Sequence, residues 1–231
     1  MGRTVAIGVQ DFETVITNDY FYVDKTDFIR EWWENGDSVT LITRPRRFGK
    51  TLNMSMLERF FSIKYAGQGQ PFADLNIWKD EKYRSLQGTC PVISLSFANV
   101  KEDTFEKARI RFGQIIADLY SRHDFLRTSG VLTKRDLEYF DRVTDHMAET
   151  DIVVALHRLC DFMERYYGRK VIILLDEYDT PMQEAYVNGF WNEIVSFIRN
   201  MFNATFKTNP FLDRAVMTGI TRVSKESIFS D

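Results

Sequence analysis

Hydrophobic residues recur along the chain at two spacings, one typical of strands and one typical of helices. The β-branched and apolar run at residues 38–43 and the continuously apolar run at 171–175 predict buried strands. Residues 91–97, where apolar and polar side chains alternate, predict another strand, and residues 214–219 predict one more. Apolar side chains three and four residues apart predict helices at 51–62, 105–119, 152–166 and 191–202, with a shorter helix or two between 132 and 147.

Strands that alternate with helices predict a fold of the α/β class. Right-handed crossovers then give a mostly parallel sheet with helices on both faces, which makes three layers. No internal repeat, low-complexity tract or Pro/Gly/Ser-rich linker interrupts the pattern, so we expect one domain over residues 1–231. Ligands bind such sheets at the carboxyl ends of the strands, and the candidate chemistry is expected there.

Turn and capping residues bound several of the predicted helices. Thr133 is expected to cap the helix that follows it, and Gly168 is expected to end the helix at 152–166. The segment 180–183, Thr-Pro-Met-Gln, resembles a capping box with proline in the first turn. We therefore expect a further helix to begin there, with Thr180 as its cap.

The first predicted strand runs into Arg-Pro-Arg-Arg-Phe-Gly-Lys-Thr (44–51) and then directly into a helix. Gly49-Lys50-Thr51 matches the end of the phosphate-loop pattern GxxxxGK[ST], whereas Arg44 stands at its first glycine. A helix N-terminus offers unpaired N–H groups and a positive dipole end to phosphate. We expect Lys50 to contact the outer phosphates and Thr51 to ligate Mg²⁺. The alternative is an ordinary strand–turn–helix corner with solvated basic side chains.

The rest of this segment is expected to surround the nucleotide. The further candidates for cofactor binding are Arg46, Arg47, Phe48, Gly49 and Leu52. Arginines beside a phosphate loop can form charge-assisted hydrogen bonds, although solvated arginines on a loop are also common. A positive φ is not expected at Arg44, so the entrance of this loop should differ from that of a glycine-rich one.

Two carboxylates, Asp176 and Glu177, follow the apolar run 171–175 directly. This is the Walker B arrangement followed by a catalytic glutamate. We expect Asp176 to hold Mg²⁺, largely through its water shell, and Glu177 to activate the attacking water. The alternative is a pair of exposed acids at a strand end. Asp179 belongs to the same acidic cluster, but the turn into the next helix accounts for it structurally.

The last predicted strand ends at Thr218, where a polar side chain can sense the γ-phosphate or the attacking water. Arg222 follows shortly after and is expected to read the γ-phosphate in cis or in trans. A hydroxyl satisfied by backbone and a surface ion pair are the respective alternatives. The candidate catalytic residues are therefore Lys50, Glu177, Thr218 and Arg222.

Composition excludes several other classes. The chain is 44% hydrophobic and 27% charged with a net charge of −3, which provides no global basic field for nucleic acid. Its two cysteines lack CxxC spacing, and its three histidines lack the spacing of a zinc enzyme. With no secretory signal and no apolar run of about 20 residues, we expect a soluble, cytoplasmic protein without a membrane partner.

With these motifs in hand, the chain resembles the AAA-ATPase-like family of P-loop proteins, found chiefly in bacteria. The stretches that carry the resemblance are 7–12, 22–26, 44–52, 175–181 and 218–225. The family shares arginine at the position of Arg44, so the resemblance implies that this departure is compatible with nucleotide binding. It also implies an additional-strand P-loop fold, in which the Walker B strand is not adjacent to the phosphate-loop strand, with ATP and Mg²⁺ as cofactors.

By analogy with related ATPases, residues 1–36 form an N-terminal segment that packs on or near the nucleotide. Tyr22 is its candidate for stacking on the adenine. Family members often carry a C-terminal PD-(D/E)xK nuclease-like domain, and the chain stops at Asp231, so we expect a fragment. The expected partners are ATP, other copies of the chain, and nucleic acid through that nuclease-like domain.

The leading functional hypothesis is therefore Mg²⁺-dependent ATP hydrolysis, to ADP and phosphate, coupled to a conformational switch. A non-catalytic nucleotide-sensing or protein-interaction module is the alternative, because the first glycine of the loop is missing. A small-molecule kinase is a third reading. Glu177 argues against it, because activation of water would compete with an acceptor hydroxyl.

Overall fold

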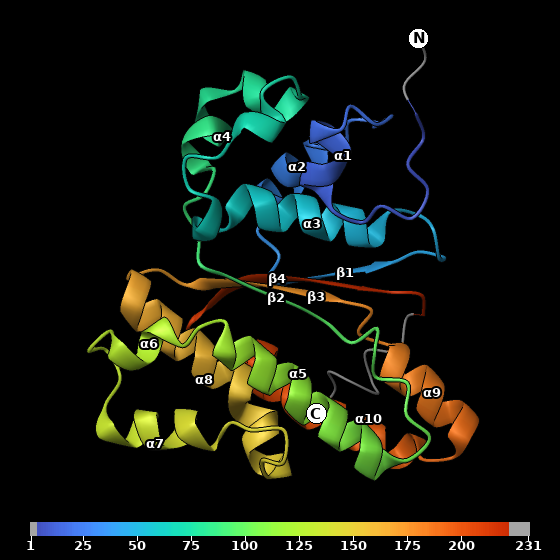
Figure 1. Cartoon of the computed structure of the whole chain (residues 1–231), viewed down its shortest axis with the longest axis vertical. Coiled ribbons are helices and arrows are strands. Elements are labelled where there is room, and N and C mark those ends of the chain that lie inside the picture. The colour runs from blue at the N-terminus through green and yellow to red at the C-terminus, as the bar shows by residue number, and fades with distance from the viewer. Residues whose placement is uncertain (1–3, 222–231) are drawn as a thin grey trace.

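A four-stranded parallel sheet lies between two layers of helices (Figure 1). The computed structural model describes residues 4–221. The strands are β1 (Val39–Thr43), β2 (Val92–Ser96), β3 (Val171–Asp176) and β4 (Leu212–Gly219), in the order β1-β4-β3-β2. This architecture confirms the expected three-layer α/β fold. Because β4 separates β1 from β3, the strand that ends at Asp176 is not adjacent to the strand that precedes the predicted phosphate loop, as the resemblance implies.

The register of the strands brings their carboxyl ends to one edge of the sheet. Thr43 lies opposite Gly219 across β1 and β4, and Ser96 lies opposite Asp176 across β2 and β3. The residues that follow these strands therefore emerge side by side. This edge is where the sequence predicts the chemistry.

The first layer comes from the part of the chain before β2. It contains α1 (Phe12–Thr17), α2 (Asp27–Asn35), α3 (Lys50–Phe61) and α4 (Glu81–Leu86), with 3-10 turns at Ile63–Tyr65, Gln70–Phe72 and Asn76–Lys79. Buried aromatic rings fill its core: Phe12 stacks on Phe72 at 4.9 Å between ring centroids, and Phe60 meets Phe72 edge-on at 5.3 Å. Burial of each such ring contributes about 1.5–3 kcal/mol.

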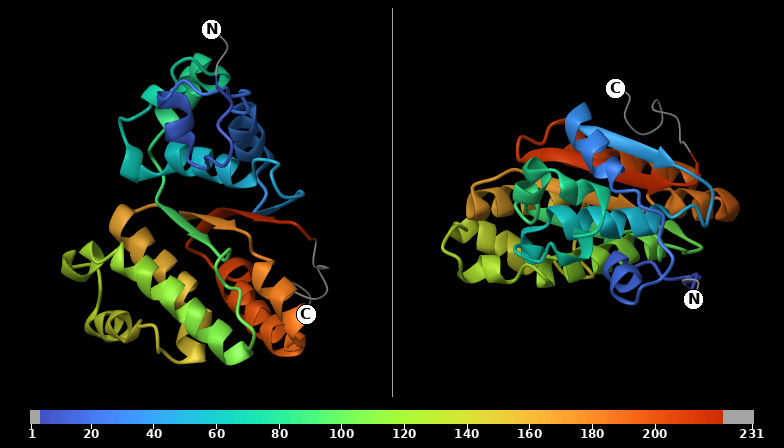
Figure 2. Two further views of the ribbon diagram at one scale, coloured as in Figure 1. Left: turned by 45° about the vertical axis from the view of Figure 1, so that its right-hand side comes forward. Right: turned by 90° about the horizontal axis from the view of Figure 1, so that it is seen from above.

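The second layer comes from the part of the chain after β2. It contains α5 (Phe105–Ser121), α6 (Phe125–Thr128), α7 (Lys134–Arg142), α8 (Glu149–Tyr167), α9 (Thr180–Asn188) and α10 (Trp191–Phe202), followed by a π-helical turn at Asn203–Lys207. The views in Figure 2 show α5–α10 on the side of the sheet opposite α1–α4.

The covering of both faces explains the continuous apolar run in β3. Ile172 and Leu174 belong to the core of the first layer, whereas Ile173 and Leu175 belong to the core of the second. Successive side chains of a strand point to opposite faces, so a strand covered on both sides needs apolar residues at every position.

Two of the predicted helix ends are confirmed and one is wrong. Thr133 forms a capping box with Asp136 at the start of α7, and Gly168 ends α8 with a φ of 65°. For α9, however, the cap residue is Asp179, and Thr180 is the first helical residue. The side-chain amide of Gln183 donates a hydrogen bond to the Asp179 carboxylate at 2.8 Å, so Gln183 supports Asp179 as the cap and not Thr180.

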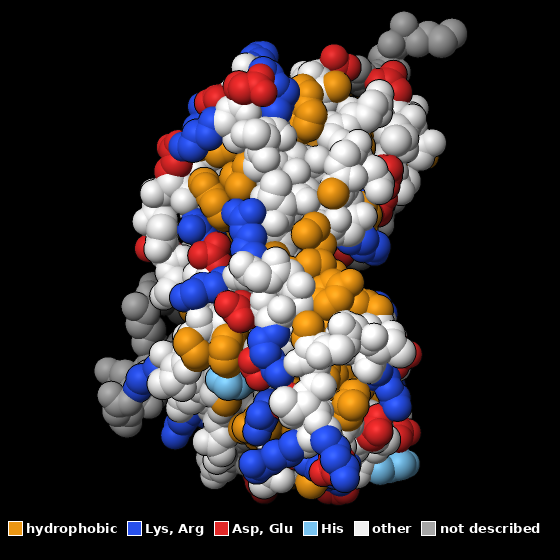
Figure 3. All heavy atoms as spheres, turned by 90° about the vertical axis from the view of Figure 1, so that its left-hand side faces the viewer, with side chains coloured by type: hydrophobic (Ala, Val, Ile, Leu, Met, Phe, Trp, Pro, Cys, Tyr) orange, Lys and Arg blue, Asp and Glu red, His pale blue; other side chains and the backbone are white. Residues whose placement is uncertain are grey.

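The surface charge and the apolar character of the helices are relevant to the expectations about nucleic-acid and membrane partners. On the side of the molecule shown in Figure 3, acidic and basic side chains are interspersed. Within residues 4–221, none of the helices combines the length and the apolar character that a membrane span requires.

Candidate active site

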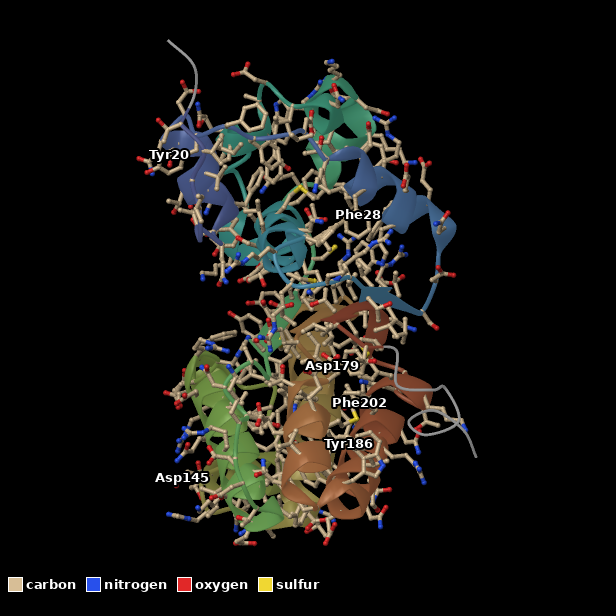
Figure 4. The ribbon with its side chains drawn as sticks, turned by 90° about the vertical axis from the view of Figure 1, so that its right-hand side faces the viewer. Tyr20, Phe28, Asp145, Asp179, Tyr186 and Phe202 are labelled. Atoms are coloured by element: carbon tan, nitrogen blue, oxygen red, sulfur yellow. The ribbon has the colours of Figure 1, made fainter. Side chains whose placement is uncertain are left out.

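The segment 44–49 between β1 and α3 lies against the end of β4. The N–H of Arg44 donates to the carbonyl of Gly219 at 3.2 Å, which extends the pairing of the two strands into the loop. Figure 4 views the molecule from the side at which the strands end, with Phe28 of α2 above them and Asp179 below them. The loop, the residues after β3 and the end of β4 therefore meet at one place.

The loop is shaped by two residues in the left-handed region, Arg47 with a φ of 68° and Gly49 with a φ of 75°. Arg44 is not among the residues with positive φ in the described part of the chain, as expected from the missing glycine. The left-handed turn falls at Arg47 instead, where a side chain costs about 1–2 kcal/mol. The loop thus reaches its helix through an arginine-rich entrance and a single glycine.

Lys50 closes the loop from its far end. Its Nζ donates to the carbonyl oxygens of Arg44 at 2.8 Å and of Pro45 at 3.1 Å, so the side chain reaches back across the turn. Gly49 is the N-cap of α3, no side chain caps the first turn, and no acidic residue lies in that turn. The helix N-terminus therefore presents its dipole and N–H groups beside a buried ammonium group, an arrangement that favours an anion.

The Asp176 carboxylate contacts the side chains of two other predicted site residues. Its Oδ2 accepts a hydrogen bond from the Thr51 hydroxyl at 2.7 Å, and its Oδ1 accepts one from the Thr218 hydroxyl. The carboxylate is buried, with 7% of the residue exposed. Side chains from α3, β3 and β4 thus meet around one carboxyl group, although they are far apart in the sequence.

Glu177 has a left-handed backbone, with a φ of 51°. Its N–H lies 3.1 Å from Asp176 Oδ1 and 3.4 Å from Thr218 Oγ1. Its carboxylate is half-buried and accepts a hydrogen bond from the Thr180 hydroxyl at 3.2 Å. Backbone strain of this kind persists where surrounding contacts impose it, and it is concentrated at functional sites.

Sequence reasoning missed the main role of Asp179, which does more than form the turn into α9. Asp179 is 1% exposed, and its Oδ2 accepts hydrogen bonds from the N–H groups of Ile220 (2.9 Å) and Thr221 (2.7 Å) and from the Thr221 hydroxyl (2.7 Å). The carboxylate therefore holds the turn that follows β4. A Cβ on Gly219 would lie only 2.6 Å from Asp179 Oδ1, so the close approach requires glycine there. The only sequence signal for this contact was the density of acids after β3.

Two cavities open on either side of α3 at this edge. One, of about 520 Å³, is lined by Lys50, Arg44, Thr218 and Phe28 among others. The other, of about 380 Å³, includes Thr51 and Asp176 in its lining. A larger cavity of about 640 Å³ lies farther along α3, and its lining includes neither Lys50 nor Asp176. The motif residues therefore mark the first two cavities as the candidate site.

The remaining predicted residues lie at various distances from the centre of the site. Arg46, Arg47 and Phe48 are exposed on the loop, with Phe48 61% exposed, and Leu52 packs against the core of the first layer. Tyr22 packs edge-on against Phe12 at 5.6 Å between ring centroids and donates its hydroxyl to Met56 Sδ at 3.3 Å. Burial raises the pKa of Tyr22 to about 12. Arg222 lies outside the described residues.

The donor set at the site suits a hard cation that retains much of its water. Within residues 4–221 there is no group of three or more His, Cys, Asp or Glu side chains placed to hold a metal. One hydroxyl and one carboxylate, Thr51 and Asp176, converge instead. Mg²⁺ is bound in this way in proteins, through one or two protein oxygens, several waters and the phosphates of a substrate.

Comparison with known proteins identifies a family for this chain. A family model described as predicted AAA-ATPase matches residues 6–229. An uncharacterized protein encoded in the vnfD 5' region of Azotobacter chroococcum mcd 1 is 25% identical over 230 residues, which is 99% of this chain and 39% of that protein. The chain thus spans about two fifths of that relative's length. No solved structure matches. On the strength of the family model, the chain belongs to the predicted AAA-ATPase family.

Proposed function

We propose that this chain binds ATP together with Mg²⁺ and hydrolyses it to ADP and phosphate. The observation that carries the proposal is the Thr51–Asp176 contact of 2.7 Å at the base of a loop that Lys50 closes. It joins the two halves of a nucleotide-hydrolysing site, which come from distant parts of the sequence. Membership of the predicted AAA-ATPase family supports nucleotide binding in general.

Lys50 and the first turn of α3 are proposed to bind the phosphates. The backbone N–H groups of the turn supply directional donors, and the Lys50 ammonium supplies charge. Gly49 lets the backbone approach closely because it carries no Cβ. The exposed Arg46 and Arg47 provide further charge at the loop, where they can form charge-assisted hydrogen bonds with phosphate oxygens.

Thr51 and Asp176 would hold Mg²⁺. When bound, the metal supplies positive charge to the phosphate oxygens, where negative charge develops during transfer. Thr218 also donates its hydroxyl to Asp176 and so fixes the orientation of this carboxylate. The two hydroxyl groups, of Thr51 and Thr218, therefore hold the Asp176 carboxylate in the position from which it would bind the metal.

Glu177 is proposed to accept the proton of the attacking water. Its backbone is left-handed, and the Thr180 hydroxyl donates a hydrogen bond that holds one carboxylate oxygen. A positioned carboxylate of this kind contributes about 10²–10⁴-fold to the rate. This role favours hydrolysis over transfer to an acceptor hydroxyl. Arg222 is proposed to stabilise the charge of the transition state, in cis or from a second copy of the chain.

The nucleoside is proposed to occupy the cavity of about 520 Å³ beside Lys50. Phe28 from α2 lines this cavity, so the N-terminal segment provides an aromatic surface for a base. Tyr22 is proposed to support that segment through its contacts with Phe12 and Met56.

Isothermal titration with MgATP and measurement of phosphate release would test the proposal on the purified chain. We expect Lys50→Ala to weaken MgATP binding at least 10-fold, and Glu177→Gln to retain binding while phosphate release falls about 10²-fold or more. Glu193→Gln is a matched control, because Glu193 is exposed on α10.

Phosphate release that survives both Lys50→Ala and Glu177→Gln would refute hydrolysis at this site. Tight MgATP binding by the wild-type chain without turnover would instead favour a non-catalytic nucleotide sensor.

A further inference from the structure

The segment Asp24-Lys25-Thr26 precedes α2 and lies beside the loop. Two of its three residues are occupied by structural contacts. Asp24 Oδ1 accepts hydrogen bonds from the N–H of Thr26 at 2.8 Å and from its hydroxyl at 2.7 Å, and Asp24 Oδ2 accepts one from the N–H of Asn76 at 2.8 Å. These bonds hold the pKa of Asp24 below its usual value, although burial alone would raise it.

Thr26 completes this anchor. It is fully buried, and its hydroxyl oxygen accepts a hydrogen bond from the N–H of Ile77 at 3.1 Å. The side chains of Asp24 and Thr26 therefore attach the segment to the 3-10 turn Asn76–Lys79. The side chain of Lys25, between them, has no part in this attachment; its carbonyl accepts a hydrogen bond from the N–H of Phe28 at 3.0 Å.

The Lys25 side chain instead reaches the loop. Its Nζ lies 3.8 Å from the position that a Cβ on Gly49 would occupy. Lys25 also lines the cavity that contains Lys50, Arg44 and Thr218. In the part of the chain that the structure describes, no hydrogen bond or ion pair engages its ammonium group. Asp27 lines the same cavity, but its carboxylate lies 3.6 Å from Arg30.

We propose that Lys25 is a second phosphate-binding lysine, supplied by the N-terminal segment to the same nucleotide that Lys50 binds. The inference rests on the proposed function and adds to it a binding residue outside the phosphate loop. The N–H groups at the start of α3 define where phosphate oxygens lie, and an ammonium group this close to Gly49 is within reach of those oxygens. A compact, hydrated point charge on a flexible stem suits phosphate oxygens rather than the face of a base.

The placement of Lys25 explains why the segment is so firmly attached. A lysine on a free chain end would lose conformational entropy on binding, whereas here Asp24 and Thr26 have already positioned its backbone. Lys25 and Lys50 approach from the N-terminal segment and from α3, so they can contact different oxygens. Substitution of Lys25 should therefore weaken phosphate binding without loss of the fold.

Isothermal titration with MgATP, MgADP and adenosine would test this inference. The variants are Lys25→Ala, Lys25→Arg, Lys50→Ala and Lys170→Ala, the last a control at an exposed lysine that precedes the amino end of β3. We expect Lys25→Ala to weaken MgATP binding about 10-fold, equivalent to about 1.4 kcal/mol, and to leave adenosine binding unchanged. Lys25→Arg should restore most of the affinity, and Lys170→Ala should match the wild type.

Thermal unfolding of the nucleotide-free protein separates binding from folding. The midpoint of Lys25→Ala should equal that of the wild type, whereas Asp24→Ala, which removes the anchor, should lower it. MgATP binding by Lys25→Ala at wild-type affinity, alongside a loss in Lys50→Ala, would overturn the role of Lys25 and leave the proposed function intact. An equal loss of adenosine affinity would overturn it as well. A wild-type chain that binds no MgATP would overturn both.

Discussion

Replacement of Asp179 with alanine removes the acceptor on which the turn after β4 depends. Four hydrogen bonds end on Asp179 Oδ2: two from backbone N–H groups of residues 220 and 221, one from the Thr221 hydroxyl and one from Gln183. Asp179 is 1% exposed. The alanine variant would therefore leave two backbone donors without their partner, beside a space from which a carboxyl group has been removed.

The magnitude follows from these donors. A backbone N–H deprived of its partner costs about 1–3 kcal/mol when it stays buried. Thr221 is exposed, so water can replace part of the hydrogen bonding that it loses. We therefore expect Asp179→Ala to lower the free energy of unfolding by about 2–4 kcal/mol. Asp179→Asn keeps an acceptor oxygen but only as a neutral one, and should cost roughly half as much. These values are large against a total stability of about 5–15 kcal/mol.

Equilibrium unfolding in urea measures the free energy of unfolding of both variants. Asp37→Ala is a control at an exposed aspartate that precedes β1. The expected order of stability is wild type and Asp37→Ala, then Asp179→Asn, then Asp179→Ala. The slope of the free energy of unfolding against urea should stay constant, which shows that the same surface is exposed in each case. If the free energy of unfolding of Asp179→Ala were within about 0.5 kcal/mol of that of Asp37→Ala, the hydrogen-bond explanation of this turn would be refuted.

Two further predictions concern backbone strain and pH. Because Glu177 has a φ of 51°, Glu177→Gly should be more stable than Glu177→Ala by about 0.5–1 kcal/mol in urea unfolding, and the opposite order would contradict the strain. Burial lowers the pKa of His123, and nearby Arg122 adds to this effect, so the folded state favours the neutral ring. The resulting stability is present above about pH 6.5 and is lost as the pH falls through the lowered pKa. Between pH 7 and 5 the thermal midpoint of His123→Gln should therefore fall less than that of the wild type, and equal slopes would exclude His123 as the source.

The spacing of apolar residues in the sequence was sufficient to predict the strands and the long helices. All four strands and the long helices lie where apolar spacing predicts them, because a parallel sheet covered on both faces imposes that spacing directly. The meeting of Thr51, Asp176 and Thr218 also followed from the rule that parallel strands present their carboxyl ends together. The contacts among these three side chains are structural findings, whereas the roles assigned to them and to Lys50, Glu177, Arg222 and Tyr22 remain predictions.

Features that depend on tertiary contacts could not be predicted in this way. α1, at six residues, is too short to be stable by itself, and its Phe12 is buried only because the rest of the first layer surrounds it. The cap of α9 was misassigned because Asp179 and Thr180 are both good capping residues, and contacts with the end of β4 decide between them. The reach of Lys25 toward Gly49 likewise depends on Asn76 and Ile77, which sequence spacing does not relate to the loop.

The position of β4 between β1 and β3 has a consequence for the newly made chain. A ribosome releases the loop at 44–51 long before it releases Leu212–Gly219, yet within the described residues β4 is the strand that pairs with β1. Until β4 emerges, β1 is an unpaired edge and Asp176 lacks the Thr218 hydroxyl. A nascent chain should therefore acquire nucleotide affinity abruptly rather than gradually. Retention of nascent chains of increasing length on an ATP resin would therefore show the length at which the sheet is completed.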